Sequence, residues 1–266
     1  MTVRVLVVRA PGTNCDFETV QAFRELSCDV TLMTFSKLVQ NRKLLHEFNI
    51  LVFPGGFSYG DYVRAGAILG KKLIARLGTE IRDFLKSGGL IVGICNGFQI
   101  LVEAGLIPGT DDVKVALTTN VSLRYECRWT ILKYESKSSP LYNNLRVGSI
   151  LRIPVGHGEG RVVTKSRDDL KFLIENDLVL FRYAKPDGTY AEEEYPWNPN
   201  GSIYDIAGLQ NIDRNVIGMM PHPERAFYTW QLPDWTRNRE LVYREKFADG
   251  YLILKSLVDH ASRIAK

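Results

Sequence analysis

The sequence predicts an α/β fold in which a mostly parallel β-sheet carries helices on both of its faces. Over the first 110 residues, short runs of consecutive apolar residues alternate with stretches of helical periodicity. Strands that are apolar at successive positions are buried on both sides, as in a parallel sheet between two helical layers. The chain of 266 residues is 45% hydrophobic and 24% charged, so it can fill a sizeable core.

The expected elements of this first part follow in order along the chain. Apolar runs predict strands over residues 3–8, 30–33, 50–53 and 90–94. A helix is expected over Asp16–Leu26, where apolar residues recur at helical spacing, and a second helix includes Glu80–Leu85. Parallel sheets of this kind bind ligands beyond the carboxyl ends of their strands, so the site is expected there.

The remaining chain is less regular. Its strand-like runs are residues 113–117, 129–132, 150–155, 178–183 and 215–220. Residues 187–202 are rich in Pro, Gly, Asn and Glu and are expected to form a surface loop. Arg239–Ala265 is expected to form one long helix that tolerates Gly250. Since no linker or repeat is visible, we expect a single domain over 1–266, with a core of about 3–226 and a helical extension of about 229–266.

Composition excludes several classes of function. The 34 basic and 30 acidic residues give a net charge of +4 without any long basic run, so no nucleic-acid partner is expected. The four cysteines are scattered and form no C-x-x-C pair, and the first residues have the pattern of a strand and not of a signal peptide. No apolar run is long enough for a membrane span. We therefore expect a soluble, cytoplasmic protein.

Cys95 lies at a sharp turn between a predicted strand and a helix. It follows the apolar run 90–94, and Gly93 and Gly97 lie two residues to either side of it. These glycines permit the tight backbone path of a nucleophile elbow in its cysteine version. At a helix N-terminus the dipole favours the thiolate, which is the nucleophilic form. A buried core cysteine is the alternative, but a core cysteine requires no flanking glycines.

A cysteine hydrolase also needs a base and a group that orients the base. Of the four histidines, His46 and His260 are expected at the surface. His222 follows the apolar run 215–220 between two prolines, and Glu224 comes two residues later. Side chains at i and i+2 of an extended segment point the same way, so Glu224 can hold one imidazole nitrogen while the other faces the thiol.

Backbone amides near the sulfur would stabilise an oxyanion. The amide of Asn96 is one candidate, and a glycine of Pro54-Gly55-Gly56 is the other, because glycine allows the backbone to approach a substrate closely. The segments 10–14 and 53–57 and the Cys95 turn all follow predicted strands. We therefore expect these three segments to meet at one edge of the sheet.

A metal site is the competing interpretation of the same residues. His157-Gly158-Glu159 repeats the spacing of His222 and Glu224, and these four side chains with Cys95 could supply metal ligands. That interpretation leaves the turn around Cys95 unexplained. We therefore expect no metal.

Together these motifs resemble the class I, or triad, glutamine amidotransferases. Longer strings are similar to one branch of that family, the glutaminase subunits of phosphoribosylformylglycinamidine synthase. The similar strings cover residues 11–16, 54–67, 93–99, 157–160, 198–202 and 218–226. The resemblance implies a flavodoxin-like sheet, and the chain from Thr229 onward is not part of the pattern.

The resemblance also implies roles for individual residues. Cys95 would attack the side-chain amide of glutamine, and His222, oriented by Glu224, would pass a proton to the leaving ammonia. The amides of Gly56 and Asn96 would hold the oxyanion, and water would hydrolyse the thioester to glutamate.

Further residues are expected near the substrate. By the same resemblance, Gln99 and the loop with His157 and Glu159 would lie beside the bound glutamine. Three more residues match a family string, but their roles stay open: Asn120, Ser122 and Arg124.

The resemblance implies partners as well. A large synthetase subunit would use ATP and the delivered ammonia to convert formylglycinamide ribonucleotide to formylglycinamidine ribonucleotide in de novo purine synthesis, and a small accessory subunit would complete the complex. ATP and magnesium are expected on the synthetase subunit. Because this chain has no G-x-x-x-x-G-K-[ST] string, no cofactor is expected here. The loop Ser58–Gly70 is the expected partner contact.

Two other functions remain open at this point. The chain could be a different cysteine hydrolase of the same fold, either free-standing or serving another synthetase. It could also be a flavodoxin-like binding or redox-sensing domain with Cys95 as its sensor. A sensor would require neither His222 nor Glu224.

Overall fold

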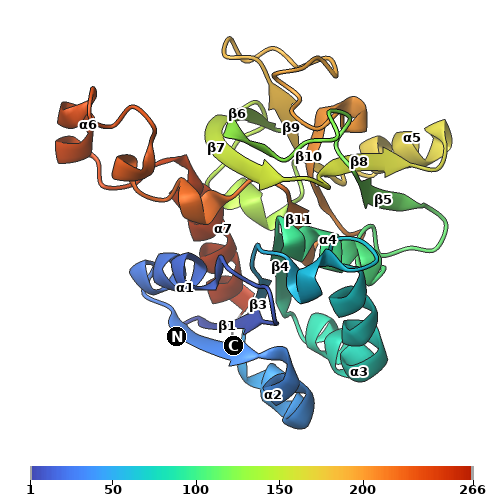
Figure 1. Ribbon diagram of the computed structural model, residues 1–266. Helices are drawn as coiled ribbons and strands as arrows, with labels where there is room; N and C mark the ends of the chain where they lie inside the picture. The colour runs from blue at the N-terminus through green and yellow to red at the C-terminus, as the bar shows by residue number, and fades with distance from the viewer. Residues whose placement is uncertain (1, 265–266) are drawn as a thin grey trace.

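The computed structural model describes residues 2–264 and is built around one nine-stranded mixed sheet (Figure 1). The strand order is β2-β1-β3-β4-β11-β10-β9-β6-β7, and β5 and β8 form a separate two-stranded sheet. The strands are β1 (Arg4–Arg9), β2 (Asp29–Thr34), β3 (Ile50–Phe53), β4 (Leu90–Ile94), β5 (Val115–Thr118), β6 (Glu126–Tyr134), β7 (Ile150–His157), β8 (Arg161–Thr164), β9 (Val179–Ala184), β10 (Ile206–Gln210) and β11 (Val216–Met219).

The two halves of the large sheet differ in strand direction. Strands β2, β1, β3, β4 and β11 pair in parallel, and their central members are buried along their whole length, as the continuous apolar runs predict. Strands β10, β9, β6 and β7 continue the sheet in antiparallel pairing. Figure 1 shows β1, β3 and β4 of the parallel half in blue to teal, below the green, yellow and orange strands of the antiparallel half.

Helices cover both faces of the parallel strands, which confirms the predicted α/β class. The helices are α1 (Asp16–Glu25), α2 (Phe35–Gln40), α3 (Ala67–Lys86), α4 (Asn96–Glu103), α5 (Arg167–Glu175), α6 (Arg239–Arg244) and α7 (Asp249–Ile264). Helix α1 contacts α7, and α3 contacts α4. Figure 1 shows the first pair on one side of these strands and the second pair on the other. No helix among residues 2–264 combines the length and the apolar character needed to cross a bilayer.

The prediction of one helix over Arg239–Ala265 is wrong for the described residues. The chain leaves helix α6 at Arg244 and begins helix α7 at Asp249, and Phe247 forms a β-bridge with Tyr228 in between. Gly250 lies in the first turn of α7, where a Cβ would come 2.0 Å from the carbonyl oxygen of Pro223. Tertiary packing against residues 223–228 thus overrides helical periodicity at this point. Ala265 lies outside the described residues.

Two predicted surface loops are partly buried. In the segment 187–202 the side chains of Asn198, Asn200 and Ser202 are buried, and they hydrogen-bond to one another and to nearby backbone. In the segment 58–70 the exposed part ends at Arg64, and helix α3 begins at Ala67. Composition predicted the loop 187–202 but not the side-chain hydrogen bonds that fold it inward. The predicted loop 58–70 is wrong for its last residues, because helix α3 already begins at Ala67.

Candidate active site

Cys95 occupies a strained turn between β4 and α4. Its backbone has φ 52° and ψ −106°, a conformation that side-chain-bearing residues rarely adopt. A Cβ on Gly97 would lie 1.8 Å from the carbonyl oxygen of Phe53, and a Cβ on Gly93 would lie 2.5 Å from the carbonyl carbon of Gly97. The flanking glycines therefore allow the turn to pack against the end of β3, which is the geometry of a nucleophile elbow.

The antiparallel half of the sheet covers this turn. The Cys95 thiol is buried and donates a hydrogen bond to the carbonyl oxygen of Gly156 on β7, with an Sγ–O distance of 3.4 Å. The carbonyl oxygen of Pro154 on the same strand accepts a hydrogen bond of 2.9 Å from the backbone N–H of His222. Strand β7 therefore positions both the thiol and the turn that carries His222.

His222 and Glu224 form a buried pair. Nδ1 of His222 lies 2.5 Å from Oε1 of Glu224, and the two residues are 2% and 1% exposed. They pair as the i, i+2 spacing predicts, across a short 3-10 turn at Pro223–Arg225. Nε2 of His222 is buried and has no hydrogen-bond partner among residues 2–264, so it is free to face a reacting group.

The surroundings of His222 favour its protonated form. Burial lowers the pKa of the imidazole, but the Glu224 carboxylate and the thiols of Cys95 and Cys15 together hold this pKa well above its usual value. The site can therefore keep an imidazolium beside Cys95. An imidazolium is the group needed to hand a proton to a leaving amine.

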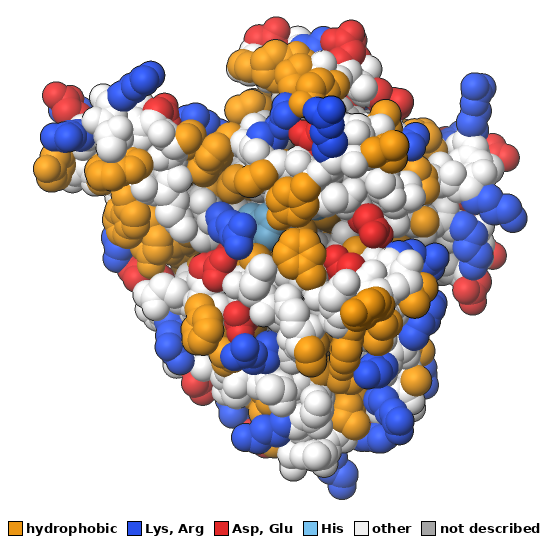
Figure 2. Space-filling view, in the orientation of Figure 1, with side chains coloured by type: hydrophobic (Ala, Val, Ile, Leu, Met, Phe, Trp, Pro, Cys, Tyr) orange, Lys and Arg blue, Asp and Glu red, His pale blue; other side chains and the backbone are white. Residues whose placement is uncertain are grey.

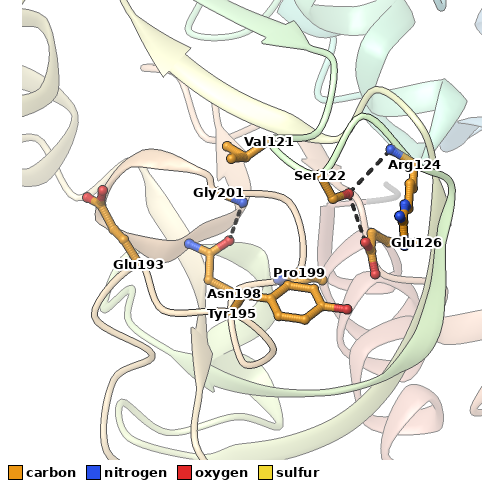
Figure 3. A pocket seen from close by; sticks show the side chains of 9 residues that line it. All are labelled: Val121, Ser122, Arg124, Glu126, Glu193, Tyr195, Asn198, Pro199 and Gly201. Atoms are coloured by element: carbon orange, nitrogen blue, oxygen red, sulfur yellow. Dashed lines mark hydrogen bonds between the residues drawn. The ribbon is translucent and has the colours of Figure 1, made fainter.

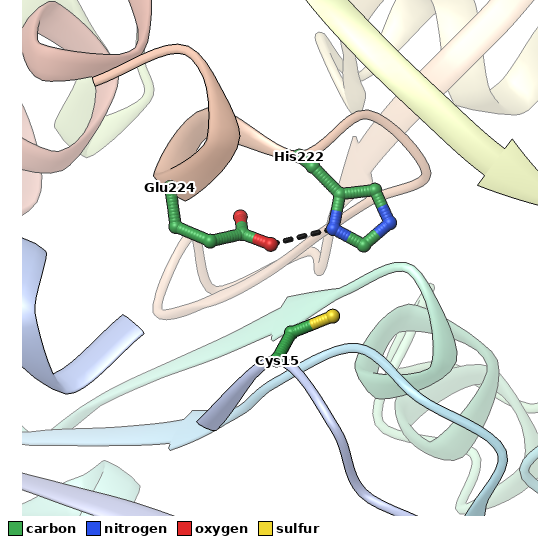
Figure 4. Close-up of side chains that lie close together, drawn as sticks. All are labelled: Cys15, His222 and Glu224. Carbon is green, nitrogen blue, oxygen red and sulfur yellow. Dashed lines mark hydrogen bonds and ion pairs between the residues drawn. The ribbon is translucent and has the colours of Figure 1, made fainter. Parts of the chain in front are cut away.

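Cys15 is a neighbour of His222 that the sequence did not reveal. It lies just before α1, is 2% exposed, and accepts a hydrogen bond from Nη2 of Arg225 at 3.1 Å. Figure 4 shows its sulfur below the imidazole ring, with Glu224 beside the ring at Nδ1. Burial is the main reason why the pKa of the Cys15 thiol is raised. In the sequence, Cys15 was marked only by its place in the string Pro11–Asp16, which is similar to a family string, and no function for Cys15 followed from that similarity.

The predicted oxyanion glycine lies beside this group. The loops 10–14 and 53–57 meet through a β-bridge between Thr13 and Gly56, as expected for segments that follow neighbouring parallel strands. The backbone N–H groups of Gly56 and Asn96 are both candidates for holding an oxyanion. Among the described residues, neither donates a hydrogen bond to a backbone carbonyl outside the regular helix and strand pairing. The amide of Asn96 is unpaired within its own helix because it opens α4.

The side chains of Asn96, Gln99 and Glu159 form one hydrogen-bonded network. Nδ2 of Asn96 donates to Oε1 of Gln99 at 2.8 Å, and Nε2 of Gln99 donates to the backbone carbonyl oxygen of Glu159 at 2.5 Å. Oε2 of Glu159 accepts from the backbone N–H of Ala65 at 3.0 Å. The network therefore ties the helix after Cys95 to the loop 58–66.

Asp61 belongs to the same network. Its Oδ1 lies 3.4 Å from Nδ2 of Asn96. Burial and the nearby Glu159 carboxylate raise the pKa of Asp61 to about 6. The loop around it has positive φ at Tyr59, Asp61 and Val63, so it is strained and depends on these contacts.

His157 is buried near the reacting groups and is held by Asn120. Its Nδ1 lies 3.2 Å from Oδ1 of Asn120, while Nδ2 of Asn120 donates to the His157 carbonyl oxygen at 2.8 Å. Burial lowers the pKa of His157 to about 3, helped by the charge of His222. His157 is therefore neutral, and Asn120 gains a role that the sequence left open.

A cavity of about 450 Å³ lies apart from the triad (Figure 3). Its walls include Ser122 and Arg124, which matched a family string, and the buried turn with Asn198 and Gly201. Ser122 donates to Oε1 of Glu126 at 2.8 Å, and Oδ1 of Asn198 accepts from the amide of Gly201 at 2.8 Å. Neither Cys95 nor His222 lines this cavity.

The metal interpretation is not supported in the form given above. Among residues 2–264, the Cys, His and carboxylate groups that lie close enough to share an ion are Cys15, His222 and Glu224. His157 bonds to Asn120, and Glu159 bonds to the loop 58–66, so neither shares an ion with His222.

Comparison with known proteins agrees with this geometry. A family model described as a CobB/CobQ-like glutamine amidotransferase domain matches residues 2–252. The phosphoribosylformylglycinamidine synthase subunit PurQ of Archaeoglobus fulgidus is 43% identical, with 98% of each chain covered. The PurQ subunit of Salinibacter ruber is 40% identical over the full length of both chains.

Solved structures show the same relationship. The structure of PurLQS from Thermotoga maritima contains a chain that is 33% identical, with a TM-score of 0.71 and 98% and 99% of the two chains covered. The glutaminase domain of Trypanosoma brucei CTPS, with a TM-score of 0.57 and 16% identity over 98% and 94% of the two chains, shares the fold. The chain described here belongs to the glutamine amidotransferase family, in the group that contains the PurQ subunits.

Proposed function

We propose that this chain is the glutaminase subunit of a phosphoribosylformylglycinamidine synthase. It hydrolyses glutamine to glutamate and ammonia, and the ammonia serves a synthetase subunit that converts formylglycinamide ribonucleotide to formylglycinamidine ribonucleotide with ATP. The observation that carries the glutaminase activity is the buried His222–Glu224 pair beside a cysteine at a strained elbow. The PurQ relatives that match this chain over nearly its full length support the purine substrate.

The reaction follows from the groups at the elbow. The Cys95 thiol passes its proton to His222, and the sulfur then attacks the amide carbon of glutamine to form a tetrahedral intermediate, whose oxyanion accepts hydrogen bonds from the amides of Gly56 and Asn96. The His222 imidazolium, held at Nδ1 by Glu224, protonates the departing nitrogen through Nε2, and a thioester remains on Cys95. Water then attacks the thioester carbon with His222 as the base, which releases glutamate and restores the thiol.

The network behind the elbow supports substrate binding. Gln99 and Glu159 connect the helix after Cys95 to the loop 58–66, so they set the position of this loop next to the nucleophile. His157 is neutral and buried, and it contributes shape and hydrogen bonding without adding charge near the substrate. Gln99, His157 and Glu159 contact glutamine directly. Gln99 and Glu159 also hold the loop 58–66 in the position in which it binds glutamine.

The synthetase subunit docks on the strained loop and its surroundings, with a small accessory subunit elsewhere in the complex. Large hydrophobic side chains are exposed there, and we define this docking rim as Phe57, Tyr62, Val63, Leu123 and Tyr125. The rings of Phe57 and Tyr125 lie 6.3 Å apart, which joins the two loops of the rim. Figure 2 shows hydrophobic side chains gathered near the middle of the molecule, where a histidine is visible in a recess. Exposed apolar clusters of this kind mark protein contacts.

The location and cofactor use follow from this assignment. The four cysteines are free thiols, which suits a reducing cytoplasm. ATP and magnesium act on the synthetase subunit, and this chain needs neither for thioester chemistry.

Ammonia release from glutamine tests the proposal. It is measured for this chain alone and with the synthetase subunit, ATP and formylglycinamide ribonucleotide, each with Cys95→Ala, His222→Ala and the surface control His46→Ala. We expect release that rises with the partner, disappears in the first variant, falls strongly in the second and is unchanged in the control. Release that persists in Cys95→Ala would overturn the assigned nucleophile, and retained release in His222→Ala would overturn the triad.

A further inference from the structure

Two residues beside the proposed triad have no part in the proposed reaction. Cys15 and Arg225 each lie in a stretch of sequence that is similar to a family string. Nη2 of Arg225 donates a hydrogen bond to Sγ of Cys15 at 3.1 Å. This bond joins the loop before α1 to the turn that carries His222 and Glu224.

The Cys15 thiol acts as both a hydrogen-bond donor and an acceptor. It donates to Oδ1 of Asn14 at 3.1 Å while it accepts from Arg225. The residue is 2% exposed, and burial raises the pKa of its thiol. A thiol that donates a hydrogen bond keeps its proton, so Cys15 serves as a neutral packing and hydrogen-bonding group and not as a second nucleophile.

This thiol lies against the imidazole of His222. Sγ of Cys15 lies within 4.8 Å of a ring nitrogen of His222 and of a carboxylate oxygen of Glu224 (Figure 4). A Cβ on Gly55 would lie 2.7 Å from Cε1 of His222 and 2.9 Å from Sγ of Cys15, so the glycine makes room for both groups. The amide of Cys15 donates to the carbonyl oxygen of Gly55 at 3.1 Å. The backbone therefore sets the place of the sulfur below the ring.

Arg225 connects the same thiol to helix α1. Its Nη2 and Nε donate to Oε1 of Glu18, in the first turn of α1, at 3.2 and 3.3 Å. Arg225 is also the last residue of the 3-10 turn Pro223–Arg225. At the other end of this turn, the backbone N–H of His222 donates to the carbonyl oxygen of Pro154 on β7. The turn is thus held between α1 and β7.

The direction of the imidazole ring decides whether Nε2 can deliver a proton. Glu224 holds Nδ1 of His222 at 2.5 Å, and this single contact fixes one ring atom while the ring can still tilt about it. A sulfur below the ring limits that tilt. A displacement of about 1 Å in a reacting group can lower a rate by about 100-fold, so a small tilt is costly for catalysis.

We propose that Cys15 and Arg225 are positioning residues that hold the His222 ring at the angle at which Nε2 reaches the substrate nitrogen. Arg225 fixes the thiol, and the thiol supports the ring. Neither residue contacts glutamine, so their loss lowers kcat and leaves KM unchanged. The effect on turnover rests on the proposed glutaminase function, whereas the support of the ring does not.

Ammonia release by the complex with its synthetase subunit tests the role of Cys15 in turnover. We expect a kcat roughly 10- to 100-fold lower in Cys15→Ala, with the same KM for glutamine. Cys15→Ser should stay within about threefold of the wild type, because a hydroxyl both donates and accepts hydrogen bonds. Cys28→Ala is the matched control, since Cys28 is also a buried free thiol but lies before β2. A kcat in Cys15→Ser as low as that in Cys15→Ala would contradict the proposal.

The ring itself is observed by NMR on the reduced full-length chain, labelled with ¹⁵N-histidine and without glutamine. The proton between Nδ1 of His222 and Glu224 should give a far-downfield resonance, which His222→Ala assigns. We expect this resonance to shift in Cys15→Ala and in Arg225→Gln and to be retained in Cys15→Ser. Arg42→Gln is the control for the second variant, because Arg42 is also an exposed arginine paired with a carboxylate, but it lies before β3.

These variants separate the positioning role from other effects. Arg225 is exposed, so Arg225→Gln provides the test if Cys15→Ala does not fold. An unchanged His222 resonance in either variant would overturn the role of that residue, even if activity falls, because the ring would not have moved. A resonance that shifts as expected in a chain without glutaminase activity would refute only the proposed function.

Discussion

At the scale of single residues, the site depends on a few positions where one atom more would not be tolerated. The elbow around Cys95 brings the ends of β3 and β4 together so closely that two glycines are required. The histidine opposite is fixed by a carboxylate and left with one free nitrogen. The chemistry of the site thus follows from steric and hydrogen-bonding constraints that individual substitutions can test.

Gly97→Ala tests the elbow. The added Cβ would lie 1.8 Å from the Phe53 carbonyl oxygen, so the turn or β3 must shift. We expect a loss of roughly 2–4 kcal/mol in the free energy of unfolding and a near-complete loss of glutaminase activity. Gly158→Ala is the control, since no atom lies within 4 Å of its added Cβ. Denaturant unfolding of both variants measures the difference, and equal stability would contradict the steric account.

The buried His157 predicts a pH dependence of stability. Its pKa is about 3 in the folded chain and near 6.5 when unfolded, so between these values the unfolded chain binds the extra proton. Its contribution is fully present above pH 6.5 and is lost as the pH falls toward 3. We expect the unfolding free energy of the wild type to fall by roughly 3–5 kcal/mol more than that of His157→Gln across this window. His46→Gln, at an exposed position, should follow the wild type; parallel curves for all three proteins would refute the buried neutral imidazole.

At the scale of elements, the sequence predicted the parallel half of the fold well and the C-terminal part poorly. Continuous apolar runs identify β1, β3 and β4 because both of their faces are buried. The break between α6 and α7 has no local signal, because it results from contacts of Phe247 and Gly250 with residues 223–228. Hydrophobic periodicity predicts individual helices and strands, and it does not predict contacts between elements that are far apart in the sequence.

The residues of the candidate site also fall into those that the sequence predicted and one that it did not. Cys95, His222 and Glu224 carry local patterns, namely an elbow and an i, i+2 pair, so they could be found from the sequence. Cys15 lies 207 positions before His222, and only the folded loops bring the two together, with Arg225 hydrogen-bonded to the Cys15 sulfur. Its sequence neighbours contain no chemical pattern that would distinguish it from a core cysteine.

Helix α7 supports the catalytic turn. The helix contacts the 3-10 turn Pro223–Arg225, and the amide of Gly250 donates to the carbonyl oxygen of Ala226 at 2.8 Å. Helix α6 buries none of its residues and stands away from the sheet in Figure 1. The two parts of the predicted extension therefore differ: α7 belongs to the packed core around the site, and α6 is exposed.

The same substitution in two helices should have opposite effects. In Gly250→Ala the added Cβ would come 2.0 Å from the Pro223 carbonyl oxygen, so α7 must move away from the catalytic turn. We expect a loss of roughly 1–3 kcal/mol in unfolding free energy and a lower kcat for glutamine hydrolysis. In Gly78→Ala, within α3, the nearest atoms would lie 3.6 Å away, and alanine should stabilise the helix by about 0.5–1 kcal/mol. Destabilisation by both substitutions would show that the contact with Pro223 is not the cause.

At the scale of the whole molecule, the proposed nucleophile lies near the proposed docking rim. The loop 58–66 is strained and carries the 90% exposed side chain of Val63, yet the buried side chain of Asn96 and the half-buried carboxylate of Glu159 hold its two ends. A docked partner would cover the apolar side chains and stabilise this loop beside Cys95. The proposed docking therefore predicts an activity that depends on the partner.

Val63→Asp tests the docking rim. Aspartate tolerates the positive φ of 75° at this position better than valine does, so the chain itself should remain stable. The added charge would lie in the apolar contact, and we expect at least about a tenfold weaker affinity for the synthetase subunit. Val147→Asp is the matched control, because Val147 is also exposed but lies in the turn before β7 and outside the rim. Titration of ammonia release with the partner measures both affinities, and an unchanged affinity for Val63→Asp would remove this residue from the interface.

The most direct test of the account is to identify the atom that carries the glutamyl group. The complex is mixed with glutamine, quenched in acid during turnover, and its cysteine peptides are analysed by mass spectrometry. The account predicts a glutamyl thioester on Cys95, no adduct on Cys15, and no adduct in Cys95→Ala. A glutamyl group on Cys15, or glutamate formation without any adduct on Cys95, would contradict the central claim that the elbow cysteine is the nucleophile.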